Sequence, residues 1–234
     1  MTKQKIELAK NIYLLLASLF ITSLVVSNLI FQKFFYWYPL DLNIFGNHLF
    51  ELSVGILPYP LTFLITDLIS EIYGKKKANQ VVVTGIFASF FSMAILLIAN
   101  RVPAIENSPI DDLTFNKVFA LSPIAVLASM IAYLLAQFVD IRIYHFWKKL
   151  TKGKHLWLRN NFSTFTSQLM DTFTIISLLI IADIIPSDKF WVLLISGFLF
   201  KVIVAILDTP LLYFFVWLFR KKFKLKVGEE IKID

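Results

Sequence analysis

The chain alternates long apolar runs with short polar connections. Six runs come close to or exceed the roughly 20 residues that a helix needs to cross about 30 Å of hydrocarbon, at about 1.5 Å per residue. The predicted spans cover residues 11–33, 57–73, 79–100, 118–141, 162–183 and 190–219. We therefore predict an all-α integral membrane protein whose residues 1–234 form one polytopic domain with no separate soluble module.

The composition agrees with a bilayer as the solvent. Hydrophobic residues make up 58% of the chain and charged residues only 17%, and the mean hydropathy is +0.72, which is too apolar for an ordinary soluble domain. The chain contains no cysteine, which excludes disulfides, thiol nucleophiles and cysteine metal sites. Since no catalytic or metal-binding motif is present either, the sequence indicates no enzyme, cofactor or metal.

The distribution of Lys and Arg predicts the orientation. With the N-terminus in the cytoplasm, the predicted inner segments hold 18 of the 23 basic residues, and the outer connections are acidic. Both termini are therefore expected in the cytoplasm, and three spans followed by three would form a 3+3 inverted arrangement, which recurs in secondary transporters. The net charge of +7 then reflects topology and contact with anionic lipid rather than nucleic-acid binding. The glycine-interrupted stretch 42–57 is expected to form an outer hairpin or re-entrant cap.

Two carboxyl groups interrupt the second apolar run. Asp67 and Glu71 stand four residues apart and project from one helical face. A charge at the centre of a spanning helix costs roughly 2.5 to 3.5 kcal/mol, so this face must meet a polar cavity, a partner or another polar helix. Glu71 could instead extend to the membrane interface near Lys75, and Asp67 could belong to an ion pair that packs helices.

The last two spans carry further polar residues. Ser167, Gln168 and Asp171 lie in the run "RNNFSTFTSQLMDTF" at residues 159–173, where Gln168 and Asp171 can reach the same ligand. Lys201 and Asp208 stand seven residues apart on one face of the sixth span, and Lys201 could neutralise a carboxylate from another span. Close packing of helices through small and hydrogen-bonding residues, and a purely structural ion pair, remain alternatives for these residues.

The candidate residues suit a planar, donor-rich ligand. A carboxylate can accept two parallel N–H bonds, such as those on the edge of a guanine-like base. Rings such as Tyr73, Phe63, Phe165 and Phe173 could stack on the heterocycle. An amine, a metal cation or a proton would also suit the carboxylates, so the residues alone do not select one ligand.

Three motifs, in order along the chain, resemble the queuosine precursor transporters, a family also described as vitamin-uptake-like. These are "PLTFLITDLISEIYGKKKA" at residues 60–78, "RNNFSTFTSQLMDT" at 159–172 and "KVIVAILDTPLLY" at 201–213. The Asp-xxx-Glu-x-Tyr-Gly core of the first corresponds to Asp67, Glu71, Tyr73 and Gly74. The resemblance extends over about residues 11–220.

The resemblance implies uptake of 7-deazaguanine precursors of queuosine, preQ0 or preQ1, across the bacterial cytoplasmic (inner) membrane. Our hypothesis is a six-helix carrier in which Asp67, Gln168 and Asp171 line a mid-membrane site and Asp208 and Lys201 complete its charge balance. The further binding candidates are Glu71, Tyr73 and Ser167. A proton could be the coupling ion, because crowded buried carboxylates can exchange protons.

Two alternatives differ in class. The chain could be the substrate-binding membrane subunit of an ATP-energised uptake complex, or an assembly protein without a ligand. Formation of a homo-oligomer, the coupling ion, the direction of transport and the preferred precursor are open at this point.

Overall fold

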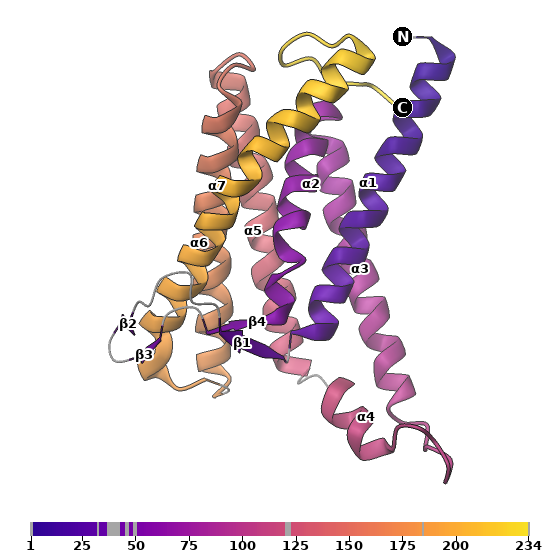
Figure 1. Ribbon diagram of the computed structural model, residues 1–234, viewed down its shortest axis with the longest axis vertical. Helices are drawn as coiled ribbons and strands as arrows, with labels where there is room; N and C mark the ends of the chain where they lie inside the picture. Colours follow the sequence, from indigo (N-terminus) through magenta and orange to yellow (C-terminus); the bar gives the residue numbers. More distant parts are fainter. Residues whose placement is uncertain are drawn as a thin grey trace.

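The computed structural model describes residues 2–31, 33–36, 43–44, 47–48, 51–119, 123–183 and 185–233. Six helical segments in these ranges are long and apolar enough to cross a membrane, which confirms the six predicted spans (Figure 1). They are α1 (Lys3–Ile30), α2 (Tyr59–Ile72) with the short helix η1 (Val54–Ile56) before it, α3 (Lys75–Ala99), α5 (Pro123–Leu150), α6 (Leu156–Ile181), and α7 (Phe190–Phe223) preceded by the short helix η2 (Ser187–Lys189).

The helix α2 lies at the centre of the bundle. In its segment Val54–Ile72, 61% of the apolar window is buried, compared with 11% in α1 and 22% in both α3 and α7. It packs against α1, α3, α5 and α7, while α5 and α6 pack along one another. Because each polar residue of α2 must then face another helix, this helix positions the polar interior of the protein.

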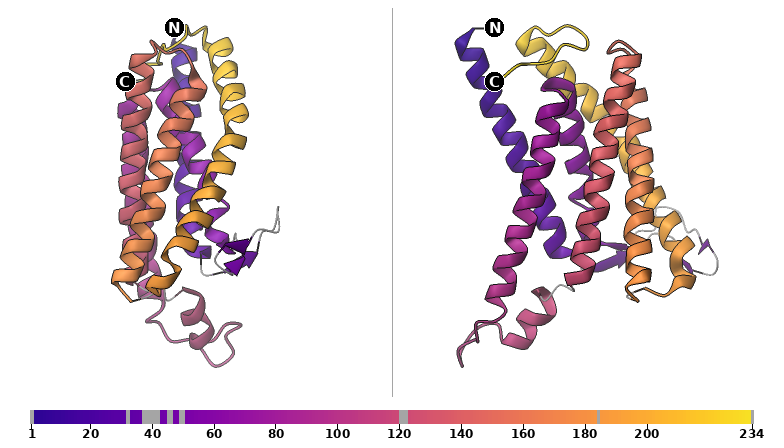
Figure 2. Two further views of the ribbon diagram at one scale, coloured as in Figure 1. Left: turned by 90° about the vertical axis from the view of Figure 1, so that its left-hand side faces the viewer. Right: turned by 180° about the vertical axis from the view of Figure 1, so that it is seen from behind.

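Both chain termini lie at one end of the bundle, which we call the termini end (Figures 1 and 2). The opposite end is the far end, where α4 (Asp112–Phe119) and the short strands lie. An even number of spans requires termini on one side, so this agrees with the predicted topology. The cytoplasmic location of the termini and the 3+3 inverted arrangement stay predictions.

The fourth spanning helix is longer than the sequence predicted. The predicted span ends at residue 141, before the basic residues begin, whereas α5 continues to Leu150. The inner face of these last turns carries Tyr144 and Lys148, both buried in the bundle. Because this face still packs against other helices, the helix continues past residue 141. The predicted connection shrinks to a tight turn in which Lys152, Gly153 and His155 have positive φ angles.

The predicted cap over residues 42–57 lies partly outside the described residues. Where described, the region forms two antiparallel pairs, β1 (Phe34–Tyr36) with β4 (Glu51–Ser53) and β2 (Asn43–Ile44) with β3 (Asn47–His48). Gly55 then lets η1 approach α1, because a Cβ atom there would lie 2.7 Å from the Ser27 carbonyl oxygen. The Ser27 hydroxyl donates to the Gly55 carbonyl and joins the two segments.

Acidic residues of the far-end connection begin the short helix α4. Asp111 Oδ1 accepts the Thr114 backbone N–H at 2.8 Å, as a helix N-cap does. Hydrogen bonds from the Thr114 side chain and backbone hold the pKa of Asp111 below its usual value. Asp112 Oδ1 accepts the Ala104 N–H at 2.9 Å. These two carboxylates therefore fix the backbone of the connection through hydrogen bonds to its N–H groups.

Candidate functional site

Glu71 is the centre of an ion cluster near the termini end. Its carboxylate is 1% exposed and lies 2.7 Å from Arg159 Nη2 of α6 and 2.6 Å from Arg220 Nη2 of α7. From α5, the Tyr144 hydroxyl donates to Oε2 at 3.1 Å and Lys148 Nζ lies 3.6 Å away. The cluster joins the central helix to three others at this end of the bundle.

The C-terminal tail packs over the same cluster. Glu230 accepts a hydrogen bond from Lys148 Nζ at 2.8 Å, and the Ile231 N–H donates to the Ile72 carbonyl at 2.7 Å. Gly74, at φ +85°, lies directly against the tail, since a Cβ atom there would be 2.3 Å from Glu230 Oε2. The positive φ angle at the turn between α2 and α3 therefore favours glycine, and the Glu230 side chain fills the space beside it.

Tyr73 also has a packing position at this end. Its hydroxyl donates to the Ala9 carbonyl at 2.9 Å, and its ring centroid lies 5.3 Å from that of Tyr13 and 6.2 Å from that of Phe219. The sequence hypothesis placed Glu71 and Tyr73 among the ligand-binding residues. In the structure both make contacts that join helices at the termini end.

Asp67 lies one turn deeper, beside an acidic residue that the sequence analysis did not single out. Its carboxyl group, on a residue only 3% exposed, is close enough to that of Asp140 in α5 for a shared hydrogen bond. The Ser167 hydroxyl donates to Asp140 Oδ1 at 2.9 Å. Three spanning helices thus contribute to one polar layer, which we call the acid layer: Asp67, Asp140 and Ser167.

Asp171 lies about one helical turn beyond the acid layer, toward the far end. It forms an ion pair with Lys201 of α7, which confirms that Lys201 neutralises a carboxylate from another span. Lys201 Nζ also donates to Thr172 Oγ1 at 3.1 Å and lies 4.8 Å from the centroid of the Tyr59 ring. Asp171 therefore lies outside the acid layer, because it stands four residues beyond Ser167 on α6, about 6 Å along the axis.

Gln168 and Asp208 line a small crevice next to this ion pair. The crevice has a volume of about 20 Å³ and is also bordered by Lys201 and Phe63. Gln168 is 3% exposed, and its Oε1 receives no hydrogen bond from the part of the chain that the structure describes. The half-buried Asp208 carboxyl projects from α7 toward the same crevice.

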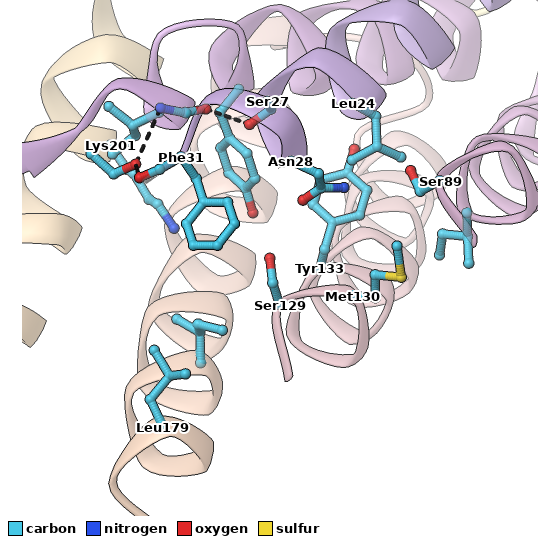
Figure 3. Close-up of a pocket in the computed structure, with 16 residues that line it drawn as sticks. Leu24, Ser27, Asn28, Phe31, Ser89, Ser129, Met130, Tyr133, Leu179 and Lys201 are labelled. Atoms are coloured by element: carbon cyan, nitrogen blue, oxygen red, sulfur yellow. Dashed lines mark hydrogen bonds between the residues drawn. The ribbon is translucent and has the colours of Figure 1, made fainter. Parts of the chain in front are cut away.

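A larger cavity of about 230 Å³ occupies the far half of the bundle (Figure 3). Its wall is mainly apolar with a few polar side chains, as in small-molecule sites. Among the lining residues are Ser27, Asn28, Phe31, Tyr59, Ser89, Ser129, Tyr133 and Lys201. Lys201 and Tyr59 also border the crevice, so the ion pair stands between the cavity and the deeper polar layers.

The aromatic rings that reach the cavity differ from those that the sequence suggested. Phe31, Tyr59 and Tyr133 line it, whereas Phe173 is 53% exposed on the outer surface of the bundle and cannot stack on a ligand inside. Phe63 packs edge-on against Tyr133, with ring centroids 6.2 Å apart. The candidate stacking rings therefore come from α2, from α5 and from Phe31, the residue that directly follows α1.

One face of α5 is the main feature that the sequence analysis missed. Tyr133, Gln137, Asp140, Tyr144 and Lys148 follow one another three or four residues apart, and each is at most 7% exposed. They form a polar stripe from the cavity to the ion cluster, which we call the α5 stripe. Their helical spacing is visible in the sequence, but the predicted end of the span at residue 141 separated Tyr144 and Lys148 from it.

Comparisons with known proteins show the family of this chain. The model of the family described as "Putative vitamin uptake transporter" matches residues 53–215. The chain belongs to this family. The matched segment contains all eight residues that the sequence hypothesis placed at the site.

Two curated relatives carry the name "Probable queuosine precursor transporter". The Bacillus subtilis relative is 28% identical over 162 residues, which is 69% of this chain and 70% of the relative. The Haemophilus influenzae relative is 23% identical over 163 residues, or 68% of this chain and 65% of the relative. No solved structure matches the chain.

Family membership confirms the resemblance seen in the three motifs. This member of the vitamin uptake transporter family is a transporter and not an enzyme, and it is a multi-pass protein of the bacterial inner membrane. Its cargo is accordingly a small molecule, and the cavity and polar layers are the parts of the fold where such a molecule could bind.

Proposed function

We propose that this transporter carries a 7-deazaguanine precursor of queuosine, preQ0 or preQ1, into the cell. The names of the two relatives support this cargo. The observation that carries the proposal is the ion pair of Asp171 and Lys201 beside a cavity of about 230 Å³. This volume is below the roughly 300 to 1,000 Å³ usual for sites of drug-sized ligands, so it suits a small heterocycle.

The cavity chemistry matches a flat base with donors and acceptors on its edges. The rings of Phe31, Tyr59 and Tyr133 offer faces for stacking. A guanine-like edge presents a ring N–H and an exocyclic amine side by side, and the Asp171 carboxylate could accept both when Lys201 turns to a carbonyl oxygen of the cargo. When the cargo binds in this way, its polar groups replace the ion pair as partners of Asp171 and Lys201, so neither charge is left without a partner in the membrane.

The charge distribution supports a direction for the cycle. If the positive-inside rule places the termini end in the cytoplasm, the cavity belongs to the outer half, and the Glu71 cluster closes the inner half. The described conformation is then an outward-facing or occluded state. Release to the cytoplasm would require α5, α6 and α7 to separate from Glu71, which makes the cluster the inner gate of the proposed cycle.

The test is accumulation of a labelled precursor in cells that lack their own uptake and synthesis. We expect uptake by the wild type and at least tenfold less uptake by Lys201→Met, by Asp171→Asn and by Asp67→Asn. Phe173→Leu, on the lipid-facing surface of α6, is the matched control and should transport normally. Absence of uptake by well-inserted wild-type protein would overturn the proposed cargo.

An ATP-energised complex with this chain as the binding subunit is less well supported, because the family and the relatives are named as transporters. Purified protein alone in lipid vesicles distinguishes the two. Uptake without any partner supports the carrier, whereas uptake only after addition of an ATPase complex supports the subunit.

A further inference from the structure

The acid layer lies deeper in the bundle than the cavity, and the lining of the cavity does not include it. Asp67 is 3% exposed and Asp140 is fully buried. Neither forms an ion pair within the described ranges of the chain, although Glu71 has three cationic partners and Asp171 has Lys201. This is an unusual environment for two carboxyl groups, because an unpaired charge inside a membrane protein is costly.

Several oxygen atoms in and around this layer have no donor. Asp67 Oδ1, Asp140 Oδ2, Gln137 Oε1 and Gln168 Oε1 are buried and receive no hydrogen bond from the residues that the structure describes. A buried acceptor without a partner costs about 1–3 kcal/mol, and more when charged. Two adjacent carboxyl groups remove this cost when one is protonated and donates to the other, since like charges so close cannot both remain ionised.

Charged and titratable groups approach the pair from each helix that packs against it. They are Glu71 on α2, Tyr133 and Tyr144 on α5, Arg159 and Asp171 on α6, and Asp208 on α7. The buried residues of α1 and α3 include no acidic or basic side chain. Arg159, the cation that acts on Asp67, lies 2.7 Å from Glu71. It is therefore committed to the ion cluster and leaves the acid layer with an excess of negative charge.

We propose that the pair of Asp67 and Asp140 binds one proton that is taken up and released in each transport cycle, and that this couples uptake to the proton gradient. The inference rests on the proposed function, since it assigns the coupling ion of the same carrier. A hydronium ion on the far side gives up the proton, so its O–H bond breaks as an O–H bond forms on one carboxylate oxygen of the pair. The proton is shared by the two carboxyl groups until this O–H bond breaks and water on the termini side accepts the proton. No other bond is made or broken.

The α5 stripe runs from the cavity past this site to the ion cluster. On the cavity side, Gln137 Nε2 donates to the Tyr133 hydroxyl at 2.7 Å, and Tyr133 lines the cavity. On the other side, Tyr144 donates to Glu71 at 3.1 Å. A polar path thus leads from the cavity through Asp140 to the inner gate, so protonation of the pair can respond to occupation of the cavity and to opening of the gate.

A proton fits this site better than a metal ion. Metal cations with oxygen ligands require several converging oxygens, and the described residues contain no group of three or more acidic or histidine side chains that could hold one. The carboxyl groups of Asp67 and Asp140 lie within hydrogen-bond reach of each other, as a shared proton requires. Sodium, which many membrane carriers use in place of a proton, is the alternative coupling ion that the experiment must exclude.

The experiment uses purified full-length protein in lipid vesicles with labelled precursor, and it separates exchange from accumulation. Exchange of labelled for unlabelled precursor across the membrane needs binding and alternating access but no gradient. We expect wild-type accumulation to fall at least tenfold when an ionophore dissipates the proton gradient. Asp140→Asn should retain exchange within about twofold and lose gradient-driven accumulation, and Glu106→Gln in the exposed far-end connection should behave as the wild type.

Each outcome decides between the inferences. If the wild type exchanges precursor but its accumulation does not depend on the proton gradient, or depends on a sodium gradient, proton coupling is overturned. The proposed cargo then stands. Persistence of gradient-driven accumulation in both Asp140→Asn and Asp67→Asn overturns the assignment to this pair. Absence of exchange in the wild type overturns the proposed cargo and the coupling that rests on it.

A measurement without cargo tests the site itself. Infrared spectroscopy of the wild type in lipid should show the band of a protonated carboxyl group near neutral pH, and this band should shift in frequency in Asp140→Asn and in Asp67→Asn, because the remaining carboxyl group then faces an amide. If the band keeps its wild-type frequency and strength in both variants, the shared proton does not exist. Asn keeps the size of Asp and its acceptor oxygen for Ser167, so a change in the band does not require misfolding.

Discussion

Neutralising Glu71 is the most informative single change for the stability of the fold. The substitution Glu71→Gln keeps the shape of the side chain and removes the one charge that three cations share. Arg159 would then remain fully buried with a neutral amide in place of its ionic partner. Since the cluster joins α2 to α5, α6 and α7, its loss should loosen the whole termini end.

The structure sets the size of the effect. Removing one partner from a buried ion pair costs about 3–5 kcal/mol, mostly because the other charge is left uncompensated. Arg159 is 0% exposed, but Arg220 is 23% and Lys148 8% exposed, so these two can regain water. We therefore expect the lower limit of about 3 kcal/mol, which corresponds to a fall in Tm of roughly 6–12 °C for a chain of this length.

The assay is thermal unfolding of purified protein in detergent, followed by the fluorescence of its five tryptophans. The matched control is Glu230→Gln, since the Glu230 side chain is 40% exposed and its ion pair should contribute at most about 1 kcal/mol. If Glu71→Gln lowers Tm no more than Glu230→Gln does, the reasoning about a buried clamp is wrong. Adding Arg159→Met to Glu71→Gln should recover part of the loss, because it removes the uncompensated cation.

Three further changes test other parts of the structure. Ile231→Ala removes a tail side chain that is 2% exposed and should cost about 2–4 kcal/mol in thermal unfolding, whereas Val227→Ala, at a residue 58% exposed, should change stability by less than about 0.5 kcal/mol. Gly85→Val would put a Cβ atom 2.6 Å from the ring of Phe20 and should destabilise the α1–α3 contact by about 1–3 kcal/mol in the same assay; unchanged stability would contradict close packing there. Ser129→Phe fills the cavity and should reduce uptake at least tenfold at normal expression, and equal uptake by this variant and the wild type would remove the cavity from the transport path.

Much of the architecture is already present in the apolar pattern. The lengths of the six runs and the bilayer thickness determine the number of spans, and the polar residues inside them identify α2, α6 and α7 as helices with a functional interior. The end of α5 could not be placed in the same way. Basic residues after residue 141 are typical of a membrane interface, and only the position of Glu71 opposite them explains why Tyr144 and Lys148 continue inward on a helix.

By itself, the sequence determined the solvent of this protein, its helical class and the set of polar residues that cannot face lipid, because these follow from local hydropathy and helical periodicity. The tertiary structure decided which of these residues meet. In the folded protein, Glu71 pairs with Arg159 and Arg220, Asp171 pairs with Lys201, and Asp67 lies beside Asp140. Such partners lie up to 149 positions apart along the chain. Which carboxylate pairs with which cation depends on how the helices pack against one another. The spacing of residues along a single helix does not contain this information.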